Sequence, residues 1–378
     1  MKTTFTLILL AACIAFAACQ DMALVYYNKG IDSMEKDDPE AAVENFEKSL
    51  TYRKDDPDAH LNLGVAYYYV GDYQASLRHL NIALESYPED PILHYALGET
   101  HAAMGSYQAA GRQYDTAIRL KDDFHEALTS QGKLKMETGD YEGAEESLIS
   151  AITIKPSYGE AYIYLGWLYA KMGKVHQATF YLYRGLKTNP NSIEGRMGLA
   201  TIFYQKQLYE DSAAEYQKVV QVEPNHAEAY LGIGECYTAL DRPVQAEDAL
   251  KKAIEINPDY AEAHKALGDL FSKQNDYTAA TAEYRMAIQL RSDYVEAHTN
   301  LARAFAGVGD LDASEASFKE ALAIDPDNAW VYYYLGNLYR IKSEDDKARI
   351  ALEQARDYAG TDENLRSSID DAVEALNR

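Results

Sequence analysis

The sequence predicts an all-α protein of ten stacked helical hairpins, and three observations lead to this prediction. One pattern returns every 34 residues, in register and without insertion, from about Ala23 to Asp362. One position of the pattern holds glycine or alanine in all ten copies, and a proline stands near the end of most copies. Such a period is typical of an α-solenoid, in which each hairpin buries its apolar face against its neighbours.

Residues 57–90 illustrate how one copy specifies a hairpin. Apolar and small side chains from His60 to Tyr67 recur at helical spacing, so they line one face of a first helix. Gly71 is expected to end that helix, because glycine turns left-handed without steric cost. A second run of helical spacing follows until Pro88, which has no N–H to donate and therefore stops the segment.

The small position marks the point where the two helices of each hairpin should pack most closely. A larger side chain there would hold the two helices apart. The residues at this position are Gly30, Gly64, Gly98, Gly132, Gly166, Ala200, Gly234, Gly268, Ala302 and Gly336.

This pattern resembles the tetratricopeptide repeat (TPR) family, whose 34-residue hairpins have fixed small and large positions and a proline near the end. The prolines that fit are Pro88, Pro156, Pro190, Pro224, Pro258 and Pro326. The resemblance covers residues 23–362. It implies a right-handed superhelix whose first helices line a concave groove, but it says little about biochemical function.

Residues 1–18 break the pattern and predict a secretory signal peptide, with a basic start and an apolar centre. The segment 16–19, Phe-Ala-Ala-Cys, resembles the end of a bacterial lipoprotein signal, which predicts a lipidated Cys19 followed by a linker over 19–22. The segment 10–13 fits the motif better, but it leaves a very short signal and an apolar stretch after the cut. Cleavage without lipid and an uncleaved anchor remain alternatives.

The two ends of the repeat array predict caps. In the first copy Lys29 replaces an apolar residue and Asp37 begins a turn without glycine, which suits a terminal repeat with one solvent-exposed face. Residues 363–378 predict a helix that covers the last hairpin. The apolar face of this helix consists of Leu365, Ile369, Ala372 and Leu376.

Composition and motifs argue against several classes of function. The formal net charge of −24 disfavours binding to nucleic acid or anionic lipid, so we expect membrane contact only through the N-terminal lipid. We find no catalytic motif and no metal-ligand spacing, since four of the nine histidines share one repeat position. We therefore expect no enzyme, no cofactor and no metal, and we interpret Cys236 as a buried structural thiol.

The candidate binding residues occupy the positions that line the groove in the family. The aromatic candidates that the packing positions do not explain are Tyr27, Tyr68, Tyr69, Tyr95, Tyr164, Trp167, Tyr204, Trp330, Tyr333 and Tyr334. Four cations, Lys265, Lys273, Arg303 and Arg340, fall on the last three copies. We expect these side chains to hold a protein or peptide, with a glycan as the alternative ligand. Packing between first helices and ion pairs with Asp269 or Glu296 are the competing interpretations.

A known ligand-binding arrangement of the family is missing. In the carboxylate clamp of chaperone-binding TPR domains, an asparagine lies between two pairs of mostly basic residues. Asn62 and Asn300 could each be that asparagine, but Tyr27 and Ile92 stand at the flanking positions of Asn62, and those of Asn300 include Asp269 and Trp330. We therefore do not expect a chaperone adaptor.

The prediction for the whole chain is an exported, non-enzymatic scaffold, lipid-anchored to the outer membrane and facing the periplasm. Gln20, rather than aspartate, follows the lipid cysteine, which favours the outer over the inner membrane. Lipidated TPR proteins that the chain resembles serve pilus assembly, secretion or exopolysaccharide export. The alternative is a polysaccharide- or peptide-binding module that uses the aromatic groove.

Overall fold

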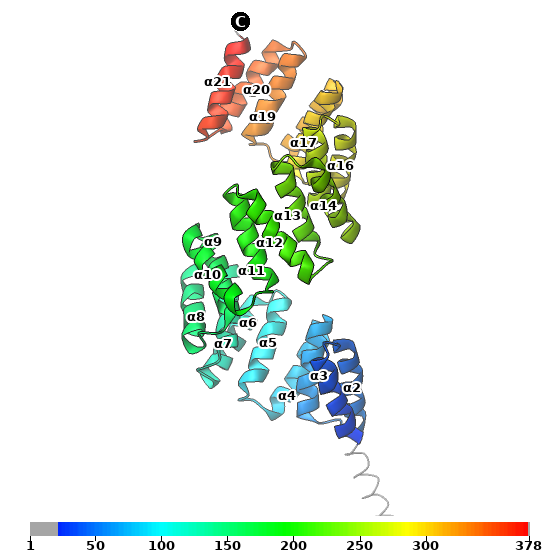
Figure 1. Cartoon of the computed structure of the whole chain (residues 1–378), viewed down its shortest axis with the longest axis vertical. Coiled ribbons are helices and arrows are strands. Elements are labelled where there is room, and N and C mark those ends of the chain that lie inside the picture. The colour runs from blue at the N-terminus through cyan, green and yellow to red at the C-terminus, as the bar shows by residue number, and fades with distance from the viewer. Residues whose placement is uncertain (1–21, 377–378) are drawn as a thin grey trace, which may run out of the picture. The chain divides into compact units, whose positions relative to one another are not determined.

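The computed structural model describes residues 22–376, and these residues form helices joined by turns, without any strand (Figure 1). The helices pair into ten consecutive hairpins and are followed by one more helix. The all-α prediction and the ten hairpins are thus confirmed. The predicted signal peptide and Cys19 lie outside the described residues. Within the described residues, no helix is long and apolar enough to cross a bilayer.

The chain divides after Pro190 into two compact units. The first unit contains five hairpins. Its helices are the segment 22–35, α2 (Pro39–Tyr52), α3 (Pro57–Val70), α4 (Tyr73–Ser86), α5 (Pro91–Ala103), α6 (Tyr107–Leu120), α7 (His125–Glu137), α8 (Tyr141–Ile154), α9 (Gly159–Lys171) and α10 (Val175–Thr188).

The second unit contains the other five hairpins and the final helix. Its helices are α11 (Ile193–Gln205), α12 (Tyr209–Val222), α13 (Ala227–Ala239), α14 (Pro243–Ile256), α15 (Ala261–Lys273), α16 (Tyr277–Leu290), α17 (Val295–Val308), α18 (Leu311–Ile324), α19 (Ala329–Ile341), α20 (Asp345–Tyr358) and α21 (Glu363–Leu376).

Each hairpin turns at one residue in the left-handed region of the backbone. These residues recur at the repeat period and are Asp37, Gly71, Gly105, Gly139, Gly173, Gln207, Asp241, Asn275, Gly309 and Ser343. Gly71 has φ 89°, as the sequence predicts, whereas Asp37 adopts φ 59° in the first hairpin, where glycine is missing. Five turns therefore hold a side chain in a conformation that favours glycine.

The small position lies where the two helices of a hairpin touch, as predicted. A Cβ added to Gly234 on α13 would lie 2.5 Å from Cγ of Leu250 on α14, which is fully buried. In other hairpins an aromatic ring takes the place of that leucine. Tyr114 and Tyr284 fill it and are each 1 % exposed, so their rings belong to the core.

The final helix α21 packs its apolar side against the last hairpin. Leu365, Ile369 and Ala372 are buried in a cluster with Leu352 and Ala355 of α20. The remaining positions of α21 are mostly exposed. The predicted capping role of this helix is confirmed by this packing.

Candidate functional site

The candidate groove residues all lie on the first helices of their hairpins, and most of them are half-buried. Tyr69 is the most exposed of the aromatic candidates at 64 %, and Trp330 is 40 % exposed. Cavities open among these helices in both units.

In the first unit, α3 and α5 enclose a cavity of about 310 Å³, which we call the apolar cavity. It brings together three predicted residues, Tyr68, Tyr69 and Tyr95, with Ile92 at 55 % exposure. The rings of Tyr68 and Tyr69 meet edge to face with centroids 5.4 Å apart. Its complete lining is Val65, Tyr68, Tyr69, Leu80, Ile92, Tyr95, Ala96, Glu99 and Thr100.

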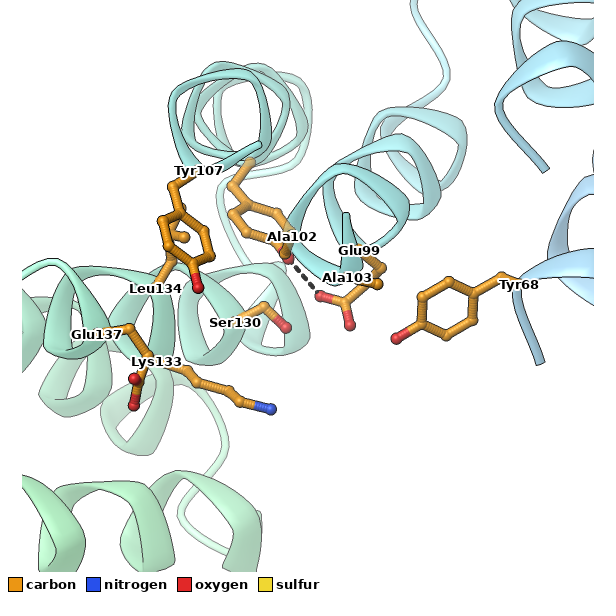
Figure 2. A pocket seen from close by; sticks show the side chains of 10 residues that line it. Tyr68, Glu99, Ala102, Ala103, Tyr107, Ser130, Lys133, Leu134 and Glu137 are labelled. Atoms are coloured by element: carbon orange, nitrogen blue, oxygen red, sulfur yellow. Dashed lines mark hydrogen bonds between the residues drawn. The ribbon is translucent and has the colours of Figure 1, made fainter. Parts of the chain in front are cut away.

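A second cavity of about 220 Å³ lies beside the first, and we call it the polar cavity (Figure 2). Both cavities share Tyr68 and Glu99, so these two residues stand at their junction. Figure 2 shows the Tyr68 hydroxyl directed toward the Glu99 carboxylate, while Lys133 extends into the same space from α7. The complete lining is Tyr68, Glu99, Ala102, Ala103, Tyr107, Tyr114, Ser130, Lys133, Leu134 and Glu137.

The absence of bulky side chains creates the polar cavity. The positions of Tyr68 and Tyr69 in the second hairpin correspond to Ala102 and Ala103 in the third. Because alanine leaves the space of a phenol ring open, the tyrosines of α3 and the polar residues of α7 face a common void.

Tyrosine hydroxyls surround the Glu99 carboxylate. The hydroxyl of Tyr114 donates a hydrogen bond of 2.6 Å to Glu99 Oε1. Burial, and then the charge of Glu99, raises the pKa of Tyr68 to about 12 and raises the pKa of Tyr95 and Tyr114 as well. These phenols therefore stay protonated near neutral pH and remain hydrogen-bond donors.

Two further aromatic candidates lie on α9. The Lys133 ammonium stands 5.3 Å from the ring centroid of Tyr164. Burial lowers the pKa of Lys133, but Tyr164 together with the charges of Glu99 and Glu160 outweighs burial, so the pKa is raised. Trp167 is half-buried one turn further along the helix. Tyr164 thus connects to the polar cavity through Lys133.

In the second unit, α15, α16 and α17 line a cavity of about 540 Å³, which we call the second-unit cavity. It contains two of the four predicted cations, Lys273 and Arg303. The guanidinium of Arg303 donates to Asn300 Oδ1 at 3.3 Å and lies 4.8 Å from the ring centroid of Tyr334. The complete lining is Asp269, Ser272, Lys273, Tyr277, Tyr284, Asn300, Arg303 and Gly307.

The four cations differ in their partners. Lys265 pairs with Asp269 at 2.8 Å, and Lys273 pairs with Asp241 at 3.1 Å. Arg340 donates to the amide oxygen of Asn337 at 2.8 Å. Within residues 22–376 neither Arg303 nor Arg340 forms an ion pair with a carboxylate. The competing ion-pair interpretation therefore applies to the two lysines and not to the two arginines.

The remaining aromatic candidates form local clusters. The Trp330 ring centroid lies 5.9 Å from those of both Tyr333 and Tyr334 on the same helix. The ring centroids of Tyr204 and Tyr209 lie 5.3 Å apart in an edge-to-face arrangement. Burial, and then the charge of Glu235, raises the pKa of Tyr204 to about 12. Packing therefore accounts for part of the contacts of these rings, as the competing interpretation expects.

The structure adds residues that the sequence analysis missed, chiefly Glu99, Tyr107, Ser130 and Glu137 around the polar cavity. The repeat register contains the signal for Glu99, because it follows the small position just as Asp269 and Arg303 do in their copies.

Histidines and cysteine serve the packing of the described residues. The histidines of the shared position bond to a backbone carbonyl, as His60 Nε2 does with the Lys54 oxygen at 2.9 Å. Cys236 is buried and bonds to the Ser212 hydroxyl at 3.3 Å, and burial raises its pKa to about 11. Among the described residues, no group of three or more His, Cys, Asp and Glu side chains is arranged to hold a metal ion.

Models of the tetratricopeptide repeat match most of the chain. The matched residues are 34–71, 66–123, 125–158, 159–192, 203–270, 268–309 and 308–340. The chain belongs to the tetratricopeptide repeat family. TPR proteins are in general protein-interaction scaffolds without catalytic activity, and membership of the family supports such a scaffold role here.

Solved TPR structures resemble the chain in fold. A tetratricopeptide repeat protein from Parabacteroides merdae has a TM-score of 0.56 at 19 % identity, over 66 % of this chain and 98 % of the other. Yeast Tom70 has a TM-score of 0.50 at 15 % identity, over 94 % and 95 % of the two chains. PilF of Pseudomonas aeruginosa has a TM-score of 0.49 at 18 % identity, over 54 % and 93 %. No curated protein matches this TPR chain.

Proposed function

We propose that this TPR protein is an envelope scaffold, exported and lipid-anchored at Cys19, that holds a partner polypeptide against the first helices of its hairpins. The machine that it assists assembles a pilus, secretes proteins or exports exopolysaccharide. The outer membrane is the proposed site of anchoring, with the repeats in the periplasm.

One observation carries the binding part of this proposal. Part-exposed aromatic and charged side chains surround cavities on the first helices, in the first unit around Tyr68 and in the second around Arg303. Protein-binding surfaces are enriched in tyrosine, tryptophan and arginine, which supply contact area and directed hydrogen bonds. Polar residues at these cavities would fix the direction of a bound chain.

Crosslinking in the native cell, followed by mass spectrometry, tests the scaffold role. A photo-crosslinking residue at Tyr69 or Trp330, which are both exposed, should capture envelope proteins. The same residue at Phe180, an exposed position on the second helix of its hairpin, is the matched control and should capture far fewer. Equal capture from all three positions would contradict a binding face on the first helices.

The proposed anchor has its own test. Metabolic labelling with palmitate should mark the wild-type protein, and Cys19→Ala should lose both the label and the membrane fraction. Loss of the label in Cys13→Ala alone would move the anchor to that residue, and an unlabelled wild-type protein would exclude lipidation.

A glycan-binding role is the second candidate, because the polar cavity combines phenol rings with Glu99, Ser130 and Lys133. Sugar rings stack on aromatic faces while their hydroxyls need both donors and acceptors. Binding to an oligosaccharide array, together with no crosslinked protein, would favour this role over the scaffold.

A further inference from the structure

We infer that the first unit recognises a basic side chain, arginine or lysine, next to a bulky apolar residue in the partner polypeptide, with Glu99 as its counter-ion. This inference rests on the proposed peptide-binding function and specifies which side chains of the partner the first unit binds.

Glu99 is the carboxylate at the junction of the apolar and polar cavities. The Lys133 ammonium attracts it across the polar cavity but forms no ion pair with it, so its charge is only partly compensated. Its partner is the neutral hydroxyl of Tyr114 at 2.6 Å. Within residues 22–376 no lysine, arginine or histidine forms an ion pair with Glu99. A half-buried carboxylate surrounded by phenol rings is poorly screened, so an incoming cation interacts with it more strongly than at an open surface.

The other charged groups of the polar cavity are already engaged. Glu137 pairs with Lys171 of α9 at 3.5 Å, and the Lys133 ammonium lies over the Tyr164 ring at 5.3 Å. Lys133 and Glu137 thus both lie on the α7 side of the polar cavity (Figure 2). A cation is therefore admitted from the opposite side, where Tyr68 and Glu99 open into the apolar cavity.

The apolar cavity determines what accompanies the cation. Val65, Ile92 and Ala96 line it together with the rings of Tyr69 and Tyr95, and its volume of about 310 Å³ has room for a leucine or aromatic side chain. Tyrosine rings beside Glu99 add cation–π attraction, which suits the flat guanidinium of arginine in particular. The negative net charge of the chain, −24, further attracts a basic segment from solution.

A random dodecapeptide library displayed on phage tests the inference on the full chain. Wild-type protein should enrich peptides with arginine or lysine adjacent to a bulky apolar residue. The best peptide is then synthesised in two forms, with the arginine intact or replaced by citrulline, which has the same shape without the charge. Wild-type protein should bind the arginine form at least tenfold more tightly.

Glu99→Gln provides the decisive comparison, because glutamine keeps the size and still accepts the Tyr114 hydrogen bond. This variant should bind the two peptide forms within about twofold of one another. Glu44→Gln on α2 removes a carboxylate that is paired with Lys48 and lines neither cavity, and this variant should keep the tenfold preference. If Glu99→Gln does not fold, Ile92→Ser replaces it, and this variant should lose the apolar preference while retaining the preference for arginine.

The outcomes separate this inference from the proposed function. Enriched peptides without basic residues, or the same arginine preference in Glu99→Gln, would overturn the inference and leave peptide binding intact. If wild-type protein selected no peptide and bound oligosaccharides instead, both the inference and the proposed function would fail.

Discussion

Alanine in place of Gly234 should destabilise the protein, whereas alanine in place of Gly111 should stabilise it. Both glycines lie inside helices, so alanine brings each helix the same gain in propensity, about 1 kcal/mol. The two sites differ in their surroundings. A Cβ at Gly234 would lie 2.5 Å from Cγ of the buried Leu250, whereas a Cβ at Gly111 would meet its nearest neighbour, Leu134 Cδ2, at 3.7 Å.

The structure sets the size of the effect. At 3.7 Å the added methyl makes an ordinary contact, so the Gly111 variant keeps the full gain of about 1 kcal/mol. At 2.5 Å the branched Leu250 must move within a packed core, which costs about 1–3 kcal/mol. Because the propensity gain is common to both, the free energies of unfolding of the two variants should differ by about 1–3 kcal/mol.

Equilibrium unfolding in urea, followed by far-UV circular dichroism, measures this difference. The midpoint of Gly234→Ala should fall below that of the wild type, and the midpoint of Gly111→Ala should rise above it. Gly234→Leu should unfold at still lower urea. A Gly234→Ala variant as stable as Gly111→Ala would show that the hairpin helices have room to separate and would refute the close-packing argument.

Three other substitutions test the turns, the histidines and the cations. Gln207→Gly removes the strain of a side chain held at φ 61° and should raise the free energy of unfolding by roughly 0.5–1 kcal/mol. The same urea assay measures this gain, and no gain would mean that the turn is not strained. Burial and then the neighbouring His60 lower the pKa of His79. The folded state thus binds fewer protons than the unfolded one, so the stability should fall as the pH drops below the usual histidine pKa of about 6.5. Thermal melts at a series of pH values should show a smaller loss of stability in His79→Gln. If the second unit binds an acidic segment of the partner, Arg303→Glu combined with Arg340→Glu should weaken partner binding at least tenfold, about 1.4 kcal/mol. A binding titration in which the double variant keeps the wild-type affinity, with no dependence on salt, would exclude an acidic segment at this site.

The hairpins could be predicted because each relies on local sequence signals. Glycine or alanine at the close contact and an apolar stripe recur in every copy, proline ends six of the ten copies, and the structure follows these signals. The left-handed Gln207 and Ser343 could not be predicted, because these residues do not favour that conformation on their own. The two helices that they join impose it.

The candidate site could be predicted only in part. The aromatic residues Tyr68, Tyr69 and Tyr95 follow from the repeat register, and the structure brings them together at one cavity. The register places Glu99 beside the small position, but its importance depends also on the neighbouring Ala102 and on the lack of an ion pair with a basic side chain. Both depend on how the helices pack against one another, and the residue types at the repeat positions do not predict this packing.

The confinement of packing to neighbouring hairpins within each unit has a mechanical consequence. Among the helices of residues 22–376, each contacts the helices one or two places along the chain, so no contact of longer range resists extension there. A pull on the two ends would unravel a unit one hairpin after another, starting where a neighbour is missing. Each 34-residue hairpin would release on the order of 100 Å of chain, so that the protein would act as a compliant tether under load.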